Sequence, residues 1–151
     1  MWDPIAMPLR PARAADAPAV TAVFQAARQA SLPYLPILHS SEEDNAYFAR
    51  VVAAGGVTVA ELDGEVVAFL ALGERLDHLY VHPDHHRQGL GSALLRAAQD
   101  ARPQLELWVF QRNAGAIAFY EAHGFVVANA TEGASNEEKE PDYLMAWHSI
   151  A

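Results

Sequence analysis

The chain has 151 residues, 52% of them hydrophobic, and a formal charge of -9 from 10 Lys and Arg against 19 Asp and Glu. This size fits a single domain over residues 1–151 whose core needs neither disulfides nor structural metal, and the absence of cysteine excludes thiolate nucleophiles and Cys-ligated zinc. The acidic balance argues against nucleic acid as a partner, because nucleic-acid binders usually present a basic face.

Residues 1–7 lack the basic start and the apolar stretch of a secretory signal. No apolar run along the chain approaches the length that spans a membrane. We therefore expect a cytoplasmic protein with no membrane partner.

Hydrophobic periodicity and turn residues predict strand, two helices, three strands, helix, strand, helix and two strands in chain order. The pair Asp63-Gly64 is a strong signal for a two-residue hairpin turn, and Pro33 and Pro36 stop helix propagation before the second helix. The predicted elements are a strand at 9–13, a helix capped by Asp16, a helix from Ser41, strands at 57–62, 65–72 and 76–81, a helix opened by Gly89 and Gly91, a strand at 105–110, a helix from Asn113 to His123, and strands at 125–128 and 143–148. This order predicts an α/β fold with a mixed sheet.

A loop with two closely spaced glycines, His86-Arg87-Gln88-Gly89-Leu90-Gly91, joins the strand at 76–81 to the following helix. Such a loop gathers backbone N–H groups at a helix N-terminus, where they can bind an anion such as a pyrophosphate. The glycine pair alone is also compatible with a tight turn. It is neither a Walker loop, because no Gly-Lys-Ser/Thr follows, nor a Rossmann fingerprint, because the preceding strand is the fourth.

Two segments resemble motifs of the GNAT superfamily of N-acetyltransferases. Residues 79–95, LYVHPDHHRQGLGSALL, look like its motif A, and residues 113–125, NAGAIAFYEAHGF, look like its motif B. Two motifs in the correct order and spacing are more specific than either one. The resemblance implies a GNAT-like α/β fold, a mixed and mostly antiparallel central sheet of about seven strands flanked by about four helices. It also implies transfer of an acetyl group from acetyl-CoA to a primary amine, and the lack of cysteine favours direct transfer in a ternary complex.

The resemblance further implies which residues bind acetyl-CoA. The strand before the loop would pair with the pantetheine arm, and the loop amides would hold the pyrophosphate. The implied cofactor-binding residues are Leu79, Tyr80, Val81, Arg87, Gln88, Gly89, Leu90, Gly91, Ser92 and Asn113. His86 departs from the Arg or Gln that relatives carry at its position, which puts the affinity for the cofactor in question.

Tyr120 lies where the family places the tyrosine that protonates or hydrogen-bonds the CoA sulfur, and the alternative is a helix-surface tyrosine packed over the sheet. The base is less defined, because the glutamate of some relatives is replaced here by Trp108. Strand alternation places Asp77 on the face of the pantetheine-pairing residues, which makes it the leading base. His78, Glu74 and a relay through ordered water stay open as alternatives.

By the family resemblance, the loop after the first helix lies beside the site that binds the acceptor amine. Tyr34 and His39 of this loop are candidate substrate contacts, and ordinary loop packing is the alternative. The acidic run Glu137, Glu138, Glu140 and Asp142 is interpreted as a solvated face, or as a border of the pocket that attracts a cationic amine. Trp108, Phe110 and Phe119 are interpreted as core, with a wall of the acceptor pocket as the alternative.

We expect no metal site, because His78, His82, His85 and His86 lack the i, i+4 spacing of a helical ligand pair. The expected partner is a small-molecule or peptide amine acceptor, with a small cationic amine favoured. A protein N-terminus or lysine as the acceptor, a non-catalytic acyl-CoA-binding sensor and a homodimer stay open.

Overall fold

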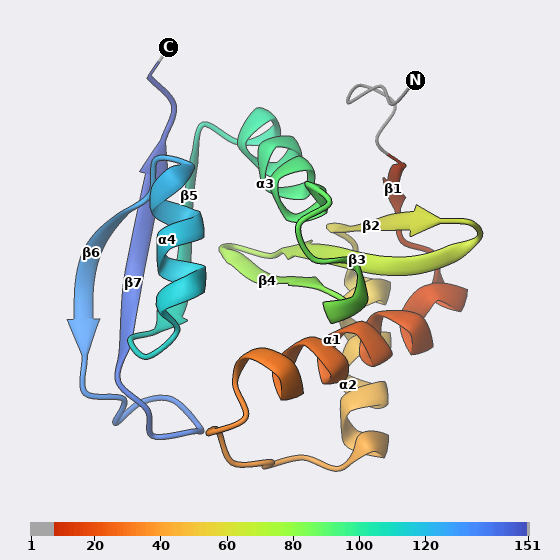
Figure 1. Ribbon diagram of the computed structural model, residues 1–151, viewed down its shortest axis with the longest axis horizontal. Helices are drawn as coiled ribbons and strands as arrows, with labels where there is room; N and C mark the ends of the chain where they lie inside the picture. Colours follow the sequence, from red (N-terminus) through yellow and green to blue (C-terminus); the bar gives the residue numbers. More distant parts are fainter. Residues whose placement is uncertain (1–7, 151) are drawn as a thin grey trace.

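The computed structural model describes residues 8–150, so the amino-terminal segment 1–7 used above to argue against a signal lies outside the described residues. Within residues 8–150 it contains seven strands and four α-helices in the predicted order (Figure 1). The strands are β1 Leu9–Pro11, β2 Val57–Leu62, β3 Glu65–Leu72, β4 Leu76–Val81, β5 Gln104–Phe110, β6 Val126–Thr131 and β7 Asp142–His148. The helices are α1 Ala17–Ser31, α2 Ser41–Ala54, α3 Leu90–Ala101 and α4 Ala114–Ala122, with 3-10 turns at Ala14–Asp16 and Pro83–His85. The predicted α/β fold class is confirmed.

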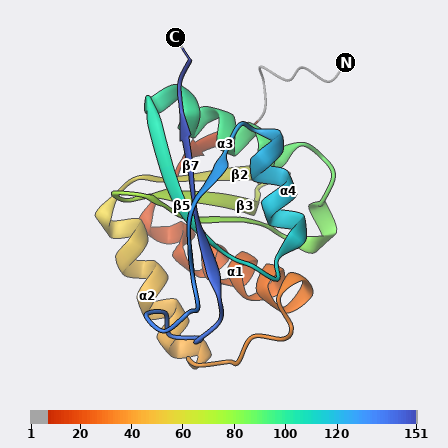
Figure 2. The same ribbon diagram turned by 90° about the vertical axis from the view of Figure 1, so that its left-hand side faces the viewer.

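The strands divide into two antiparallel sheets, β1-β2-β3-β4 and β5-β7-β6. Among residues 8–150 no hydrogen-bonded ladder joins β4 to β5, although the two strands are in contact. In Figure 1, α3 lies above the four-stranded sheet and α1 below it. In Figure 2 the three-stranded sheet is seen nearly edge-on in front of the four-stranded one, with α4 to its right. The predicted central sheet is therefore divided between β4 and β5.

Two hydrophobic clusters fill the space on either side of β3. Ala68 and Leu70 belong to the cluster under α3, whereas Phe69 and Ala71 belong to the cluster under α1 and α2. Because successive side chains of a strand point to opposite faces, a strand covered on both faces needs apolar residues at consecutive positions. The run Val66 to Leu72 meets that requirement. The β2–β3 hairpin turns at Asp63-Gly64 as predicted, with Leu62 paired to Glu65 and positive φ at both turn residues.

Helix α2 begins at Ser41, as predicted, and Ser40 is its N-cap. The Ser40 hydroxyl accepts from the Glu43 N–H at 3.1 Å, and the Glu43 carboxylate accepts from the Ser40 N–H at 2.9 Å, which is a complete capping box.

Among the described residues, no helix has both the length and the apolar character needed to cross a bilayer.

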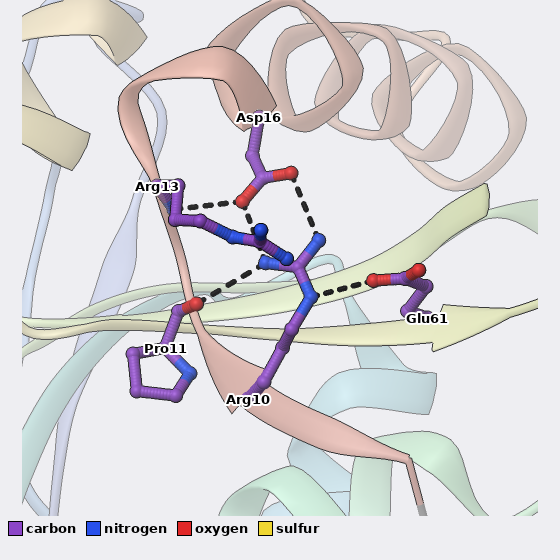
Figure 3. Close-up of polar contacts among 5 residues, drawn as sticks. All are labelled: Arg10, Pro11, Arg13, Asp16 and Glu61. Atoms are coloured by element: carbon purple, nitrogen blue, oxygen red, sulfur yellow. Dashed lines mark hydrogen bonds and ion pairs between the residues drawn. The ribbon is translucent and has the colours of Figure 1, made fainter. Parts of the chain in front are cut away.

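Arg10 attaches β1 to its neighbours through two carboxylates (Figure 3). Its guanidinium donates to Asp16 at 2.8 and 3.0 Å and to Glu61 on β2 at 2.5 Å. Asp16 is the N-cap residue of α1, as predicted, but its side chain does not cap that helix. Its carboxylate accepts from the Arg13 N–H at 2.7 Å and caps the 3-10 turn before α1. The hydrogen bonds from Arg10 lower the pKa of Asp16 to about 2.

Candidate active site

A cleft of about 460 Å³ lies between the end of β4, the first turns of α3 and α4, and the last turn of α1. Seven predicted cofactor and catalytic residues line it: Leu79, Tyr80, Val81, Arg87, Gly91, Asn113 and Tyr120. The other lining residues are Ala27, Ser31, Leu32, His86, Gly115, Ala116 and Phe119. The structure thus brings together residues that the sequence places in four separate segments.

The glycine loop leaves the first amides of α3 without a side-chain cap. Arg87 has φ +65° and Gly89, the N-cap residue, has φ +81°, and no side chain accepts from the first turn of α3. By contrast, Ser40 and Asn113 cap α2 and α4 through their side chains. A left-handed residue followed by the free N–H groups of a helix start forms an anion-binding concavity. The backbone from Arg87 to Ser92 therefore fits a phosphate.

Gly91 keeps the cleft open beside this loop. An added β-carbon would lie 3.5 Å from the Phe119 ring and 3.7 Å from a Val81 methyl group, both on residues that line the cleft. A side chain larger than alanine at position 91 would therefore enter the space between α3 and α4. By contrast, a β-carbon added at Gly115, at the start of α4, would meet no atom of the described residues within 4 Å.

His86 connects the glycine loop to the end of β4. Its Nε2 lies 3.1 Å from the Val81 carbonyl oxygen, and the side chain lines the cleft. His85 Nδ1 lies 3.3 Å from Gln88 Oε1 within the same loop. Gln88, Gly89, Leu90 and Ser92 do not line the cleft, and Leu90 is 2% exposed, with its side chain in the core.

Tyr120 is buried on α4 and still reaches the cleft. It is 8% exposed and packs against the rings of Phe119 and Phe125, with centroids 5.3 and 5.5 Å away. Burial raises the pKa of Tyr120, and the nearby Tyr80 raises it further, so the hydroxyl stays protonated at neutral pH. Tyr120 lines the cleft, so a ligand bound there can reach its protonated hydroxyl.

Comparison with known proteins agrees with this geometry. The family model described as an acetyltransferase (GNAT) domain matches residues 53–127, which include β4, α3, α4 and the glycine loop. The chain belongs to the GNAT acetyltransferase family. It is 35% identical over 91 residues to the Escherichia coli peptidyl-lysine N-acetyltransferase YiaC. This alignment covers 59% of this chain and 61% of YiaC. The chain spans between 52% and 61% of the length of the first curated relatives it matches.

Solved GNAT structures share the fold over almost the whole chain. A GCN5-related N-acetyltransferase structure from Rhodopseudomonas palustris superposes with a TM-score of 0.78 at 25% identity, covering 93% of this chain and 94% of that one. The PaiA N-acetyltransferase of Thermoplasma acidophilum, solved in complex with coenzyme A, superposes with a TM-score of 0.67 at 16% identity, covering 93% and 98%.

Asp77, the leading base from the sequence, does not line the GNAT cleft. The β3–β4 ladder pairs Ala71 with His78 and Leu72 with Leu76, so Asp77 lies in a bulge. The bulge breaks the alternation that placed Asp77 on the face of the pantetheine-pairing residues. Its carboxylate lies against Gly73 in the turn before β4, where partial desolvation raises its pKa. Glu74, in the same turn, does not line the cleft either.

His78 lies in an aromatic cluster between β4 and helices α1 and α2. Five rings surround its imidazole with centroids 5.2 to 6.4 Å away: Phe24, Tyr47, Phe48, Phe69 and Tyr80. Its Nε2 lies 2.8 Å from the Tyr47 hydroxyl, whereas its buried Nδ1 has no partner. Burial lowers the pKa of His78 to about 4, so the ring is a weak base at neutral pH. Within residues 8–150 no group of three or more His, Asp or Glu side chains is placed to hold a metal ion.

Tyr34 and His39 do not line the cleft, and both take part in contacts that attach the α1–α2 loop to the β6–β7 loop. The Arg112 guanidinium lies 3.8 Å from the Tyr34 ring centroid and pairs with Glu140 at 2.7 Å. His39 pairs with Glu137 at 2.7 Å and with Glu43 at 3.6 Å, and these carboxylates raise its pKa. The Tyr34 hydroxyl is buried without a partner.

The acidic run is therefore not simply a solvated face, because three of its members form ion pairs with other segments. Besides the pairs of Glu137 and Glu140, Glu138 pairs with Arg28 of α1 at 3.1 Å. Water screens such pairs at partly exposed sites, so each one stabilises the loop only modestly. Together they attach the β6–β7 loop to α1, to the α1–α2 loop and to the β5–α4 loop.

A second cavity of about 470 Å³ lies on the face of the three-stranded sheet opposite α4, and we call it the Asp142 cavity. Its lining residues are Trp108, Val109, Phe110, Thr131, Ser135, Asn136 and Asp142. Trp108 is 45% exposed, so the prediction that it is a core residue is wrong and the alternative, the wall of a pocket, fits. Alternation along β5 buries Leu107 and Val109 and turns Trp108 outward.

Proposed function

We propose that this chain is an acetyl-CoA-dependent N-acetyltransferase that moves the acetyl group directly to a primary amine, with a small cationic amine favoured. The observation that carries the proposal is the cleft, where the uncapped start of α3, the edge of β4 and the protonated hydroxyl of Tyr120 meet. Membership of the GNAT family and the names of its relatives support this activity.

The residues present fit acetyl-CoA. The amides from Arg87 to Ser92 would bind its pyrophosphate, with the Arg87 guanidinium adding charge at the rim. Leu79 and Val81 lie on the edge of β4 that no strand covers, so their backbone groups can pair with the amides of the pantetheine arm. The Oδ1 of Asn113 accepts from the Ala116 N–H at 3.2 Å, which leaves its amide nitrogen for the cofactor.

When bound, acetyl-CoA supplies the acetyl group as an activated thioester. Tyr120 holds a proton at its hydroxyl and donates it to the departing sulfur. No carboxylate lines the cleft among the described residues, and neither Asp77 nor His78 reaches it. The proton lost by the attacking amine therefore leaves through water, the alternative to a side-chain base. Only the neutral amine has the lone pair needed for attack.

A lysine side chain in a peptide is a second candidate acceptor, because YiaC carries the name peptidyl-lysine N-acetyltransferase. A non-catalytic acyl-CoA sensor is a further alternative, which the buried and still accessible Tyr120 argues against. Location in the cytoplasm and assembly as a homodimer stay predictions.

The direct test measures free thiol released from acetyl-CoA in the presence of a panel of amines and lysine peptides. The chain contains no cysteine, so a thiol reagent reports only the CoA that is released. We expect release that depends on the amine and follows the formation of acetylated product. Binding of acetyl-CoA in a calorimeter without release across the panel would favour the sensor, and no binding would refute both proposals.

A further inference from the structure

The Asp142 cavity contains a carboxylate without a cationic partner. Asp142 is 8% exposed, and its carboxylate accepts from the Thr131 hydroxyl and from Asn136 Nδ2 at 3.3 Å. Both donors are neutral, so neither compensates the negative charge. A buried carboxylate is usually paired with a cation or fully hydrogen-bonded, and two neutral donors leave part of its accepting capacity unused.

Three cations of neighbouring segments are paired with other carboxylates, and Lys139 of the same loop donates to the Ala134 carbonyl at 2.7 Å. Arg112 binds Glu140, Arg28 binds Glu138 and His39 binds Glu137. Among the residues that line the cavity there is no Lys, Arg or His. A cation that pairs with the Asp142 carboxylate must therefore come from a ligand.

The rest of the lining indicates what kind of cation fits. Trp108 and Phe110 present aromatic surface to the cavity, and Trp108 is 45% exposed. Aromatic faces attract organic cations and pack against aliphatic chains. A volume of about 470 Å³ can hold a short aliphatic amine. A carboxylate beside aromatic walls therefore matches an alkylammonium group.

We propose that the Asp142 cavity binds a second cationic group of the acceptor, distinct from the amine that is acetylated. This inference rests on the proposed function. A carboxylate in contact with an amine stabilises its protonated form, which has no lone pair for attack. The amine held by Asp142 is thus the one that does not react, and the acceptor class is an amine that carries another cation on an aliphatic stem.

The position of the cavity agrees with this division of roles. The cavity and the cofactor cleft flank the end of β5, since Phe110 lines the cavity and Asn113, three residues later, lines the cleft. Two sources share the required chemistry: a free diamine, and a peptide in which a lysine is close to another basic residue.

The test titrates the wild-type chain in a calorimeter with 1,5-diaminopentane and with 1,5-pentanediol, which has the same chain without the charges. We expect the diamine to bind about tenfold more tightly or better, as a charge-assisted hydrogen bond at a buried site provides. Asp142→Asn should abolish this preference. Asp100→Asn makes the same change of charge at an exposed position of α3, outside the cavity, and should preserve it.

Asp142→Asn keeps an oxygen that can accept from Thr131, and circular dichroism will report whether it folds. If Asp142→Asn does not fold, Trp108→Leu takes its place as the test, because a partly exposed side chain can be replaced without disturbing the core. Loss of the Trp108 ring should weaken diamine binding several-fold. Equal binding of the diamine and the diol, or a preference that survives in both variants, would overturn the proposal.

Acetyl transfer measured in parallel separates this inference from the proposed function. If diamine binding requires Asp142 but no acetylated product forms, the proposed enzymatic activity is refuted and the cation site is supported. Acetylation of 1-aminopentane and the diamine with equal kcat/KM refutes the site and keeps the enzyme. A Lys-Arg peptide and a Lys-Ala peptide form the second arm, and a preference for Lys-Arg that Asp142→Asn removes supports the site and assigns the peptide source.

Discussion

Replacement of His78 by phenylalanine should remove a large part of the acid sensitivity of the fold. The imidazole lies among five aromatic rings, and its Nδ1 is buried without a partner. Phenylalanine places another ring in this cluster and eliminates the unpaired nitrogen. Tyr47, which loses its contact with His78, is 41% exposed, so its hydroxyl can bind water instead.

The magnitude follows from the pKa of His78, which burial lowers from 6.5 to about 4. The pKa of His78 is lower in the folded state than in the unfolded state. The neutral imidazole therefore costs no stability above about pH 6.5, and the free energy of unfolding falls as the pH drops toward about 4. Each pH unit across that window costs up to about 1.36 kcal/mol, about 3.4 kcal/mol in total. Between pH 7 and pH 5 the loss in the free energy of unfolding should be about 2 kcal/mol.

Urea unfolding followed by circular dichroism at pH 7 and pH 5 measures this loss. We expect His78→Phe to lose about 2 kcal/mol less than the wild type over this interval. His148→Gln, which removes an exposed histidine at the end of β7, should behave like the wild type. If His78→Phe loses as much stability as the wild type, the imidazole is not held neutral by burial and the reasoning fails.

Four further predictions concern the cleft. Tyr120→Phe should lower kcat about tenfold or more with little change in acetyl-CoA affinity, because it removes a proton donor used in the transition state. Gly91→Val should weaken acetyl-CoA binding at least about tenfold in calorimetry while circular dichroism stays unchanged, since its methyl groups enter the cleft beside Phe119. Asp77→Asn should leave the pH profile of kcat unchanged, because its carboxylate does not reach the cleft. His86→Ala should weaken acetyl-CoA binding several-fold, since it frees the glycine loop from the Val81 carbonyl.

Each of these has an outcome that contradicts it. An unchanged kcat removes Tyr120 from the mechanism, and full affinity in Gly91→Val means that the cofactor does not pass position 91. A rate for Asp77→Asn that falls at neutral pH and recovers at high pH restores Asp77 as the base. Unaltered binding by His86→Ala shows that the loop keeps its shape without the imidazole.

The central hairpin and β4 could be predicted residue by residue, because their signals are local. Asp63-Gly64 allows positive φ at both turn positions, and Pro83 ends the strand before it. The end of α2 also has a local cause, since its C-cap residue Gly55 has a φ of +86°. Strand β6 was predicted too short, because most of its side chains are exposed and show no alternation.

The parts of the site that could not be predicted depend on contacts between distant segments. No feature of the sequence marks the bulge that holds Asp77, since it is defined by pairing with β3. The partners of the acidic run lie on α1 and in two loops, about 30 to 110 residues away, so its ion pairs could not be inferred from spacing. The small residues Ala27 and Ser31 on one side of α1 were a usable signal for the cleft, because i, i+4 positions share a helix face.

The division of the sheet between β4 and β5 has a consequence for thermodynamic linkage. A ligand that lies along the free edge of β4 takes the place of a neighbouring strand and connects the two halves of the molecule. Its binding energy then adds to the folding energy of the whole chain, by about 2.7 kcal/mol when the ligand is present at a hundred times its Kd. The melting temperature of this chain would thus report the concentration of its own cofactor, and the substrate would serve as the missing strand of the sheet.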